Sequence, residues 1–444
     1  MRMLFRILFQ TVLMLAVPLG AGAGSAVAAA AHPTPSAGKA ATTGTGTTPA
    51  VPVAVLPVQS AAAAEGPQGA LVIIGGGLRP DNDAVWQRIV QLAGGKGARI
   101  AVFASAAADP APVAAAIVDY LKRYGADAFQ IPLAVKLADS DFRKAAEDPL
   151  LADAVRGAGG VFFSGGDQAR ITQALVREDG SRSAVLDAVW EVYRKGGVVA
   201  GNSAGAAVMS STMFYAPKTV FATLRGGVRD GEEIAPGLGF IGDDVFVDQH
   251  FLVRGRFARM IPAMLKKGYK YGLGIDENTA MVVDSRRRVE IVGSKGALLI
   301  DLSHATTDAA RAGFNISNAV ISYLDNGDLY DLGTHAFTPS QAKAGGLLKA
   351  HKDLVADPVF SPDILGRNAL VQLMENLMNN RRSEAIGIAT SGRNTPLPEL
   401  GFQFTLTKTR DSVAYASAAP QSYSILNMRL DIRPLDIGQS LRTE

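Results

Sequence analysis

Thiol chemistry is excluded from this protein because its 444 residues include no cysteine. Disulfides, a cysteine nucleophile, iron–sulfur clusters and thiolate zinc sites all need residues that the chain lacks. Histidine is also scarce. Any histidine base must be one of the five in the sequence, which are His32, His250, His304, His335 and His351.

The chain also lacks a strong excess of either positive or negative charge. Lys and Arg number 44 against 41 Asp and Glu, and this net charge of +3 is too small to indicate nucleic-acid binding. The glycines at 75–77 are not followed by Gly-Lys-Ser/Thr, so they form no phosphate-binding loop and are expected to pack tightly instead. We expect no metal and no cofactor. Hydrophobic residues at 48% are typical of a globular protein with a sizeable core.

The first residues have the pattern of an export signal. Arg2 and Arg6 precede an apolar run at 7–19, and small residues follow it. Because the run is short for a membrane span, we expect a signal peptide at 1–28, no permanent membrane span, and a periplasmic or extracellular location. Residues 29–66 are mostly Ala, Thr, Pro, Gly and Val, which predicts a flexible linker.

Apolar strands alternate with amphipathic helices in the segment 67–337. Candidate strands lie at 71–74, 99–104, 129–133, 160–163 and 197–200. This alternation predicts an α/β domain with a mostly parallel sheet and helices on both faces. In such sheets the chemistry lies at the carboxyl ends of the strands, so the residues that follow each strand are the first candidates.

A serine follows the strand expected at 197–200. The sequence there is Gly201-Asn202-Ser203-Ala204-Gly205, a G-x-S-x-G placed between a strand and a helix. In this arrangement the flanking glycines allow a sharp turn that lifts the serine hydroxyl above the sheet. The N–H of Ala204 would be free at the helix start to bind an oxyanion. Ser203 is therefore the candidate nucleophile.

A serine nucleophile needs a base, and the base needs an acceptor that orients it. His250 lies in the apolar segment 245–251, which is predicted to be a strand, whereas the other histidines lack such a setting. Asp276 or Glu277, at the end of another apolar run, could orient the imidazole. Asp248 is a third candidate, since it lies on the same face of the strand as His250. Spacing alone does not choose among the three.

Four motifs together resemble the cyanophycinases, serine peptidases related to dipeptidase E. They are SGGDQ at 164–168, GNSAGA at 201–206, DQHF with R-x-R-x-x-R at 248–259, and GIDENTA at 274–280. The resemblance covers about residues 71–302. It implies an α/β fold like that of the class I glutamine amidotransferases, with serine in place of cysteine.

The resemblance also implies roles for single residues. Ser203 matches the nucleophile, His250 the base and Glu277 the acid of a catalytic triad, and Gly166 would supply an oxyanion-hole N–H beside that of Ala204. The residues that match substrate contacts are Gln168, Asp248, Gln249, Arg254, Arg256 and Arg259. Cyanophycin is a poly-aspartate with arginine on each side chain, so arginines would bind its carboxylates and Asp248 its guanidinium groups. Without the motif, a solvated helix start would be the favoured interpretation of the three arginines.

The reaction that the resemblance implies is acyl transfer through Ser203, with β-aspartyl-arginine dipeptides as products. Two alternatives remain at this stage. One is a periplasmic α-aspartyl dipeptidase of the dipeptidase E kind, and the other is a catalytically silent binding protein on the same fold. The partner is thus cyanophycin or aspartyl peptides, and the sequence leaves a homodimer open.

The segment 338–444 differs in character and contains no catalytic constellation. We expect a C-terminal α+β extension that binds substrate, packs on the core or mediates assembly. Its predicted elements are a helix at 364–378, a strand at 401–407 and a partner strand at 423–432. Just before it, Asp325-Asn326-Gly327-Asp328 predicts a turn that joins strands at 318–323 and 328–332 in a hairpin.

Overall fold

The computed structural model describes residues 67–348, 354–390, 400–417 and 422–436. The signal peptide and the linker expected at 1–28 and 29–66 lie outside the described residues, as do His32 and His351. Within the described ranges, no helix combines the length and the apolar character that a membrane span needs.

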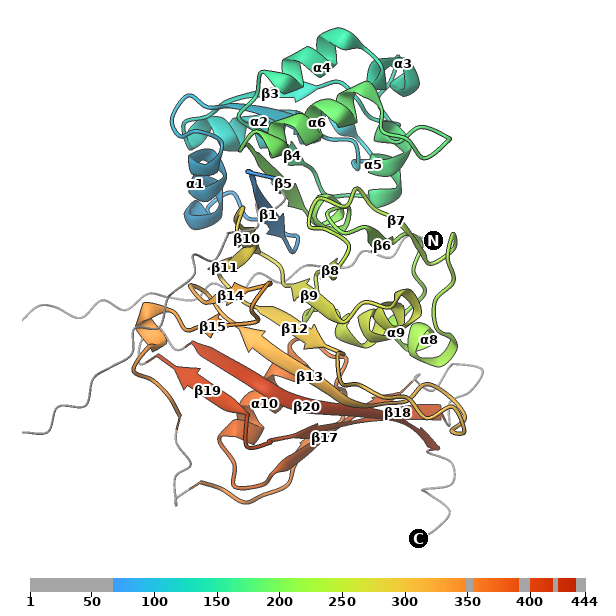
Figure 1. Ribbon diagram of the computed structural model, residues 1–444, viewed down its shortest axis with the longest axis vertical. Helices are drawn as coiled ribbons and strands as arrows, with labels where there is room; N and C mark the ends of the chain where they lie inside the picture. Colours follow the sequence, from blue (N-terminus) through green and yellow to red (C-terminus); the bar gives the residue numbers. More distant parts are fainter. Residues whose placement is uncertain (1–66, 349–353, 391–399, 418–421, 437–444) are drawn as a thin grey trace, which may run out of the picture. The chain divides into compact units, whose positions relative to one another are not determined.

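The first sheet has nine strands in the order β15-β14-β11-β10-β1-β5-β4-β2-β3 (Figure 1). Its parallel half contains β1 (Ala70–Ile74), β5 (Val198–Asn202), β4 (Gly160–Phe163), β2 (Arg99–Phe103) and β3 (Asp127–Ile131). Its antiparallel half contains β10 (Thr279–Val283), β11 (Arg288–Gly293), β14 (Leu329–Asp331) and β15 (Phe337–Thr338). The expected sheet was mostly parallel, and the observed one is mixed because β10 pairs antiparallel with β1.

Helices cover both faces of the parallel half, as the alternation predicted. Val72 and Ile74 pack with α1 (Asp83–Leu92) and α2 (Pro110–Arg123) on one face. Leu71 and Ile73 belong to the core of the other face. The helices on that side are α3 (Phe142–Ala146), α4 (Pro149–Arg156), α5 (Gln168–Leu175) and α6 (Ala184–Arg194). Successive residues of β1 thus alternate between two cores, one on each face of the sheet. Because both faces are buried, the strand is apolar throughout.

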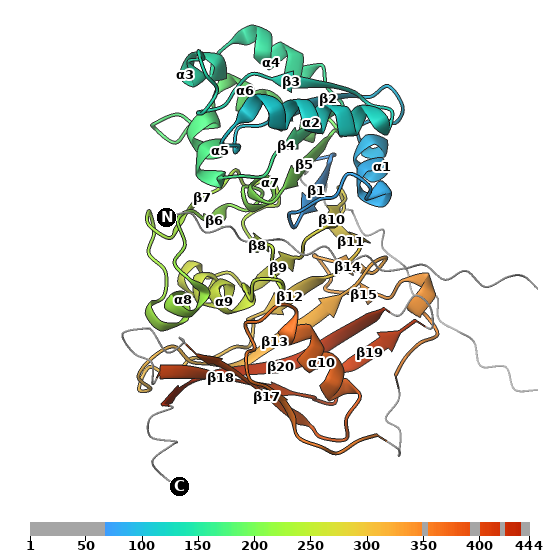
Figure 2. The ribbon, with the colours of Figure 1, turned by 180° about the vertical axis from the view of Figure 1, so that it is seen from behind.

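The second sheet joins the middle of the chain to its C-terminal part (Figure 2). Its order is β16 (Val359–Ser361), β17 (Glu384–Thr390), β18 (Leu400–Thr407), β20 (Tyr423–Asp436), β13 (Ile316–Leu324), β12 (Ala297–Asp301), β9 (Tyr271–Ile275) and β8 (Val245–Gln249), with β19 (Val413–Ala416) also paired to β20. Strands from both sides of the boundary expected at residues 337 and 338 therefore lie in one sheet.

Shorter elements complete the described fold. They are α7 (Ala204–Ala207), α8 (Val220–Gly226), α9 (Phe257–Lys267), α10 (Ala369–Met378), the 3₁₀ helix η1 (Gln341–Lys343), and the two-stranded sheet of β6 (Thr212–Phe214) and β7 (Ile234–Pro236). The residues of α8, α9 and α10 pack with those of the second sheet in one apolar core.

Of the elements predicted near the C-terminus, some are confirmed and others are not. The pairing of the strands expected at 401–407 and 423–432 is confirmed by β18 and β20. The helix expected at 364–378 begins later, at Ala369. The hairpin predicted through 325–328 is wrong, since β13 pairs with β12 and β20 while β14 pairs with β11 and β15. The turn is present, but it carries the chain from one sheet to the other.

Candidate active site

Ser203 lies in a strained turn between β5 and α7. Its φ of +55° and ψ of −106° are a conformation that residues other than glycine rarely adopt. Backbone hydrogen bonds hold it there: its N–H donates to the carbonyl of Ile74 at 2.9 Å, and its carbonyl accepts from Ala206 and Ala207, both at 2.9 Å. The nucleophile elbow predicted from the sequence is present, and the hydroxyl stands at the carboxyl end of β5.

The two glycines of G-x-S-x-G are required by close packing. A Cβ on Gly201 would lie 2.2 Å from the carbonyl oxygen of Gly205, and a Cβ on Gly205 would lie 2.4 Å from that of Phe163. Since the neighbouring atoms belong to backbone, a side chain at either position would displace the turn.

His250 follows β8 and is also held by its backbone. Its φ is +47°, and its N–H donates to the carbonyl of Gly75 at 2.7 Å. The imidazole occupies the space that a side chain at position 76 would need, because a Cβ on Gly76 would lie 2.2 Å from His250 Cε1. The tight packing expected for the glycines at 75–77 is present at Gly75 and Gly76 but not at Gly77, and at Gly76 it leaves room for the histidine ring.

A chain of hydrogen bonds joins Ser203, His250 and Glu277. Ser203 Oγ lies 2.8 Å from His250 Nε2, and His250 Nδ1 lies 2.7 Å from Glu277 Oε1. With the carboxylate as acceptor, Nδ1 carries the proton and Nε2 is left to accept from the serine hydroxyl. Of the three acceptors left open by the sequence, Glu277 is the one in contact. Asp276 instead accepts from the N–H of Val253 at 3.2 Å.

Burial and neighbouring charges tune both members of this pair. Burial lowers the pKa of His250 below its ordinary value, and the charges of Arg254 and Arg256 act in the same direction, against the hydrogen bond to Glu277. Burial acts to raise the pKa of Glu277, but the hydrogen bond and charge of His250, with nearby Lys295 and Arg254, outweigh it and hold that pKa below its ordinary value. At neutral pH the histidine is therefore neutral and the glutamate ionised.

The two backbone N–H groups expected to bind an oxyanion lie on either side of Ser203. Ala204 is the first residue of α7, and Gly166 belongs to the loop between β4 and α5. That loop abuts the nucleophile, since a Cβ on Gly165 would lie 3.3 Å from Ser203 Cβ. Among the hydrogen bonds of the described residues, neither N–H donates to another backbone or side-chain group. Both are available to a bound oxygen.

Asp248 forms a buried network with two of the predicted substrate-binding arginines. Arg259 donates to it through both Nε and Nη2 at 2.8 Å, and Arg256 Nη1 lies 3.5 Å from its Oδ1. Arg256 also donates to the backbone carbonyl of Gln249 at 2.7 Å and to its Oε1 at 2.8 Å. Burial lowers the pKa of Arg256 to about 10. Asp248 and Arg259, predicted as separate substrate contacts, therefore neutralise each other in the interior.

The remaining predicted contacts occupy more open positions. Arg254 keeps 53% of its side chain exposed, and its Nη2 lies 3.9 Å from Glu277 Oε1. Gln168, the first residue of α5, donates from Nε2 to the carbonyl of Phe214 at 2.7 Å. The structure thus brings Arg254 beside the Ser203–His250–Glu277 chain, while Gln168 holds the strand β6 to the oxyanion loop.

Sequence reasoning missed Asn278, the neighbour of Glu277. Its Oδ1 accepts from the N–H of Arg79 at 3.0 Å and from Nδ2 of Asn82 at 2.9 Å. Its Nδ2 donates to Ser294 Oγ at 3.1 Å, and its own N–H donates to the carbonyl of Gly76 at 2.8 Å. Asn278 therefore fixes the backbone that carries Glu277. Its φ is +55°, a conformation that Asn tolerates better than most residues. The sequence signal that could have found it is therefore the presence of Asn directly after Glu277.

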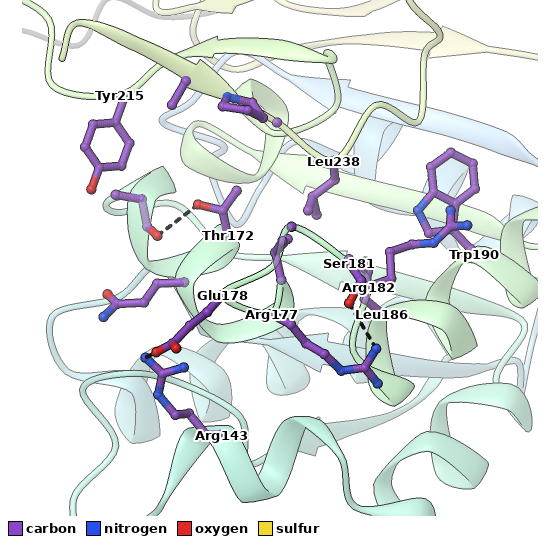
Figure 3. A pocket seen from close by; sticks show the side chains of 17 residues that line it. Arg143, Thr172, Arg177, Glu178, Ser181, Arg182, Leu186, Trp190, Tyr215 and Leu238 are labelled. Carbon is purple, nitrogen blue, oxygen red and sulfur yellow. Dashed lines mark hydrogen bonds and ion pairs between the residues drawn. The ribbon is translucent and has the colours of Figure 1, made fainter. Parts of the chain in front are cut away.

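A cavity of about 940 Å³ lies elsewhere (Figure 3). Its lining residues come from α5, the loop 177–182, α6 and the β6–β7 region, and do not include Ser203, His250 or Glu277. Arg143 is paired there with Glu178 at 2.8 Å, and Arg177 with Glu147 at 2.7 Å. These charges are therefore already compensated, and the candidate catalytic residues lie outside this cavity. In the part of the chain that the structure describes, no cluster of three His, Asp or Glu side chains suits a metal ion.

Comparison with known proteins gives one consistent result. Residues 71–291 match the model of peptidase family S51. The chain is 33% identical over 250 residues to a cyanophycinase of Synechococcus elongatus, covering 55% of this chain and 73% of the relative. It is 29% identical over 272 residues to a cyanophycinase of Geminocystis herdmanii, covering 60% and 94%.

Two solved structures are also similar. One is a peptidase from an acI-B1 Actinobacterium, at 23% identity and a TM-score of 0.39, covering 52% of this chain and 91% of that one. The other is a putative peptidase E protein of Listeria monocytogenes, at 14% identity and a TM-score of 0.34, covering 51% and 98%.

Proposed function

The chain belongs to peptidase family S51 and is a serine-type peptidase, and we propose that it is an exported enzyme that degrades cyanophycin to β-Asp-Arg dipeptides through an acyl-enzyme on Ser203. The observation that carries the proposal is the hydrogen-bonded chain from Ser203 through His250 to Glu277. Such a chain supplies a nucleophile, a base and a group that orients the base.

The first half of the proposed reaction forms the acyl-enzyme. Ser203 Oγ attacks the carbonyl carbon of an aspartyl peptide bond while its proton passes to His250 Nε2. Glu277 stabilises the imidazolium through Nδ1–H, and the N–H groups of Gly166 and Ala204 bind the oxyanion. The C–N bond then breaks, and the proton on Nε2 goes to the leaving amine.

The second half releases the acyl group. A water molecule gives a proton to His250 Nε2 as its oxygen attacks the ester carbonyl. When the tetrahedral intermediate collapses, the bond to Ser203 Oγ breaks and Oγ takes the proton back. In both halves every proton passes through His250 Nε2, and Glu277 orients the imidazole without taking a proton, so the proposed reaction needs no cofactor or metal.

The substrate assignment rests on the arginines and on the relatives. Both curated relatives described above carry the name cyanophycinase. Arg254, half exposed beside Glu277, is placed to bind a carboxylate of the polymer bidentately. A hydrogen-bonded network beside it consists of Asp248, Gln249, Arg256 and Arg259. Gln168 follows the loop that contains Gly166. A fold like that of the class I glutamine amidotransferases is part of the same proposal.

Hydrolysis of purified cyanophycin granules tests the function. The wild-type protein should release β-Asp-Arg dipeptides, and Ser203→Ala should lose activity by about 10⁶-fold while remaining folded. The exposed Ser181→Ala is the matched control and should behave as wild type. Activity retained in Ser203→Ala would contradict the nucleophile. Cleavage of soluble Asp-X dipeptides without attack on granules would favour the aspartyl dipeptidase instead.

Export is tested separately by expression of the full chain in a bacterium with a periplasm. The mature N-terminus should lie near residue 29, because small residues precede that position. An intact N-terminus in the cytoplasmic fraction would contradict export and leave the hydrolytic assignment untouched.

A further inference from the structure

A cavity of about 200 Å³ lies behind the loop that carries His250. Leu252 and Asp276 line it from the side of that loop. The other lining residues follow the segment matched by the family model and are Lys295, Tyr323, Asn368, Val371, Gln372 and Glu375. The last four come from α10 and the residue before it, and Figure 2 shows α10 beside β13 and β20. The C-terminal segment thus builds one wall of a cavity next to the active site.

Tyr323 places a hydroxyl without a partner in this cavity. Its residue is 8% exposed, and none of the hydrogen bonds among the described residues involves its hydroxyl. The phenol end lies at Gly296, since a Cβ there would be 2.6 Å from Tyr323 Cζ. The carbonyl of Gly296 accepts from the N–H of Asp276, which also lines the cavity. A ligand in the cavity would supply the hydrogen-bond partner that this hydroxyl lacks within the described residues.

The surroundings of the cavity have an excess of negative charge. Lys295 Nζ lies 3.2 Å from Asp276 Oδ2, and this pair is neutral. Glu375 has no cation: within the described ranges its carboxylate makes neither an ion pair nor a hydrogen bond. Asp325, whose charge acts on Glu375, is bound by the N–H of Asn326 and the hydroxyl of Ser422. Burial and the charge of Asp325 raise the pKa of Glu375, so a cation beside it would relieve an unfavourable charge.

The acceptors in the cavity suit a planar cation with several donors. Gln372 Nε2 donates to Asn376 Oδ1 at 3.2 Å, which leaves the carbonyl oxygen of Gln372 for a ligand. With the Glu375 carboxylate and the Tyr323 oxygen, three acceptors face a space that also has the apolar walls Leu252 and Val371. A guanidinium group on an alkyl chain carries five N–H donors and an apolar stem, and matches both features.

We propose that this cavity is a second binding site that takes the guanidinium group of an arginyl ligand. The cavity is tied to the catalytic loop at two points. Asn368 N–H donates to the carbonyl of Leu252 at 3.1 Å, and Asp276 Oδ1 accepts from Val253 N–H at 3.2 Å. A ligand here therefore contacts the residues that hold the chain between His250 and Arg254. That the ligand is the arginyl product of this enzyme rests on the proposed function, whereas guanidinium binding does not.

Calorimetric titration of the full chain with L-arginine tests the site. Ser203→Ala is the background, so that nothing is turned over. L-citrulline, which has the same shape without the charge, is the ligand control. Glu375→Gln should weaken one arginine-binding component about tenfold or more, and Tyr323→Phe should weaken it less, through the lost hydroxyl. Glu384→Gln, an exposed carboxylate on β17, should change nothing. Any arginine bound in the catalytic pocket is common to all these variants.

The outcomes separate this site from the proposed function. Equal arginine affinity with and without Glu375, or equal binding of citrulline and arginine, would overturn the site. A β-Asp-Arg dipeptide that shows the same dependence on Glu375 would identify the product as the source of the guanidinium group. If free arginine binds in this way and the dipeptide does not, the site is supported and free arginine is the source of the guanidinium group. If the wild-type protein does not hydrolyse cyanophycin, only the proposed function is refuted.

Discussion

The nucleophile and its base are held by different kinds of interaction. Ser203 stands at the end of a central strand of the first sheet and is fixed by backbone, through its N–H to Ile74 and through glycine contacts on both sides. His250 follows β8, the edge strand of the second sheet, and has one backbone hydrogen bond, from its N–H to Gly75. It also depends on side chains, which are Glu277 on its ring and the pair of Arg259 with Asp248 of β8. The first half of the site is therefore fixed by backbone contacts, and the second half needs side chains as well.

The C-terminal segment contacts the second half directly. Asn368 N–H donates to Leu252, and a Cβ on Gly255 would lie 2.5 Å from the carbonyl oxygen of Leu365. Phe404 of β18 packs edge-on against Phe257 at the start of α9, with ring centroids 5.7 Å apart. The loop between His250 and α9 is thus packed against residues more than a hundred positions later, so changes in the C-terminal segment should act on the base and not on the nucleophile.

The largest effect is expected from Glu277→Gln. The amide keeps the shape of the side chain but cannot stabilise the imidazolium, and it allows the wrong tautomer of His250, so kcat should fall by about 10⁴-fold. Steady-state kinetics on soluble β-Asp-Arg oligomers measures the loss. Glu290→Gln is the control. It changes a residue of β11 and breaks the ion pair with Arg88 of α1, and it should leave kcat within about twofold. An unchanged kcat in Glu277→Gln would move the orienting role to Asp276 or Asp248.

The next effect is on stability. Arg259→Leu leaves the buried Asp248 without its bidentate partner, so the free energy of unfolding should fall by about 3–5 kcal/mol. Urea unfolding followed by circular dichroism measures it. Arg288→Leu breaks a half-exposed pair with Asp284 and should cost less than about 1 kcal/mol. Equal losses in the two variants would show that the Asp248–Arg259 pair is not a structural element of the base half.

A smaller effect is expected where the two halves meet. Gly76→Ala would place a Cβ 2.2 Å from His250 Cε1 and displace the imidazole, which should lower kcat by about 10²-fold. Gly77→Ala is the matched control. Its φ is also positive, at +56° against +108° for Gly76, but its nearest neighbours, atoms of Glu277, would lie at 3.7 Å or more. Comparison of kcat with the melting temperature separates ring displacement from backbone strain, and equal losses of kcat in both variants would contradict the displacement.

The same contrast explains what the sequence could predict. The elbow at Ser203 is encoded in five consecutive residues whose glycines and strand–helix context are visible without any partner. His250 was found because few histidines compete. The choice of Glu277 over Asp276 and Asp248, by contrast, required the motif resemblance, since neighbours in sequence diverge in space: Asp276 turns inward to Val253 while Glu277 faces the ring.

Long-range pairing is what the sequence left out. The mutual neutralisation of Asp248 and Arg259 is invisible in the motif, where each residue is an equally plausible contact for substrate. The second sheet was missed for a similar reason, because β13 pairs with β20, which lies far along the chain. Periodicity identifies a strand such as β18, but it does not reveal which sheet the strand joins.

The smallest predicted effect concerns the charge around His250. The base must be neutral to accept the proton of Ser203, so kcat/KM should fall as the pH drops through the pKa of His250, which burial and two arginines hold below 6.5. Arg254→Gln removes one of these positive charges, so the pKa should rise and the acidic limb should move to higher pH. Arg288→Gln, remote from the ring, is the control. Because a lost substrate contact changes the height of the profile and not its midpoint, an unmoved midpoint in Arg254→Gln would show that the arginine acts on substrate alone.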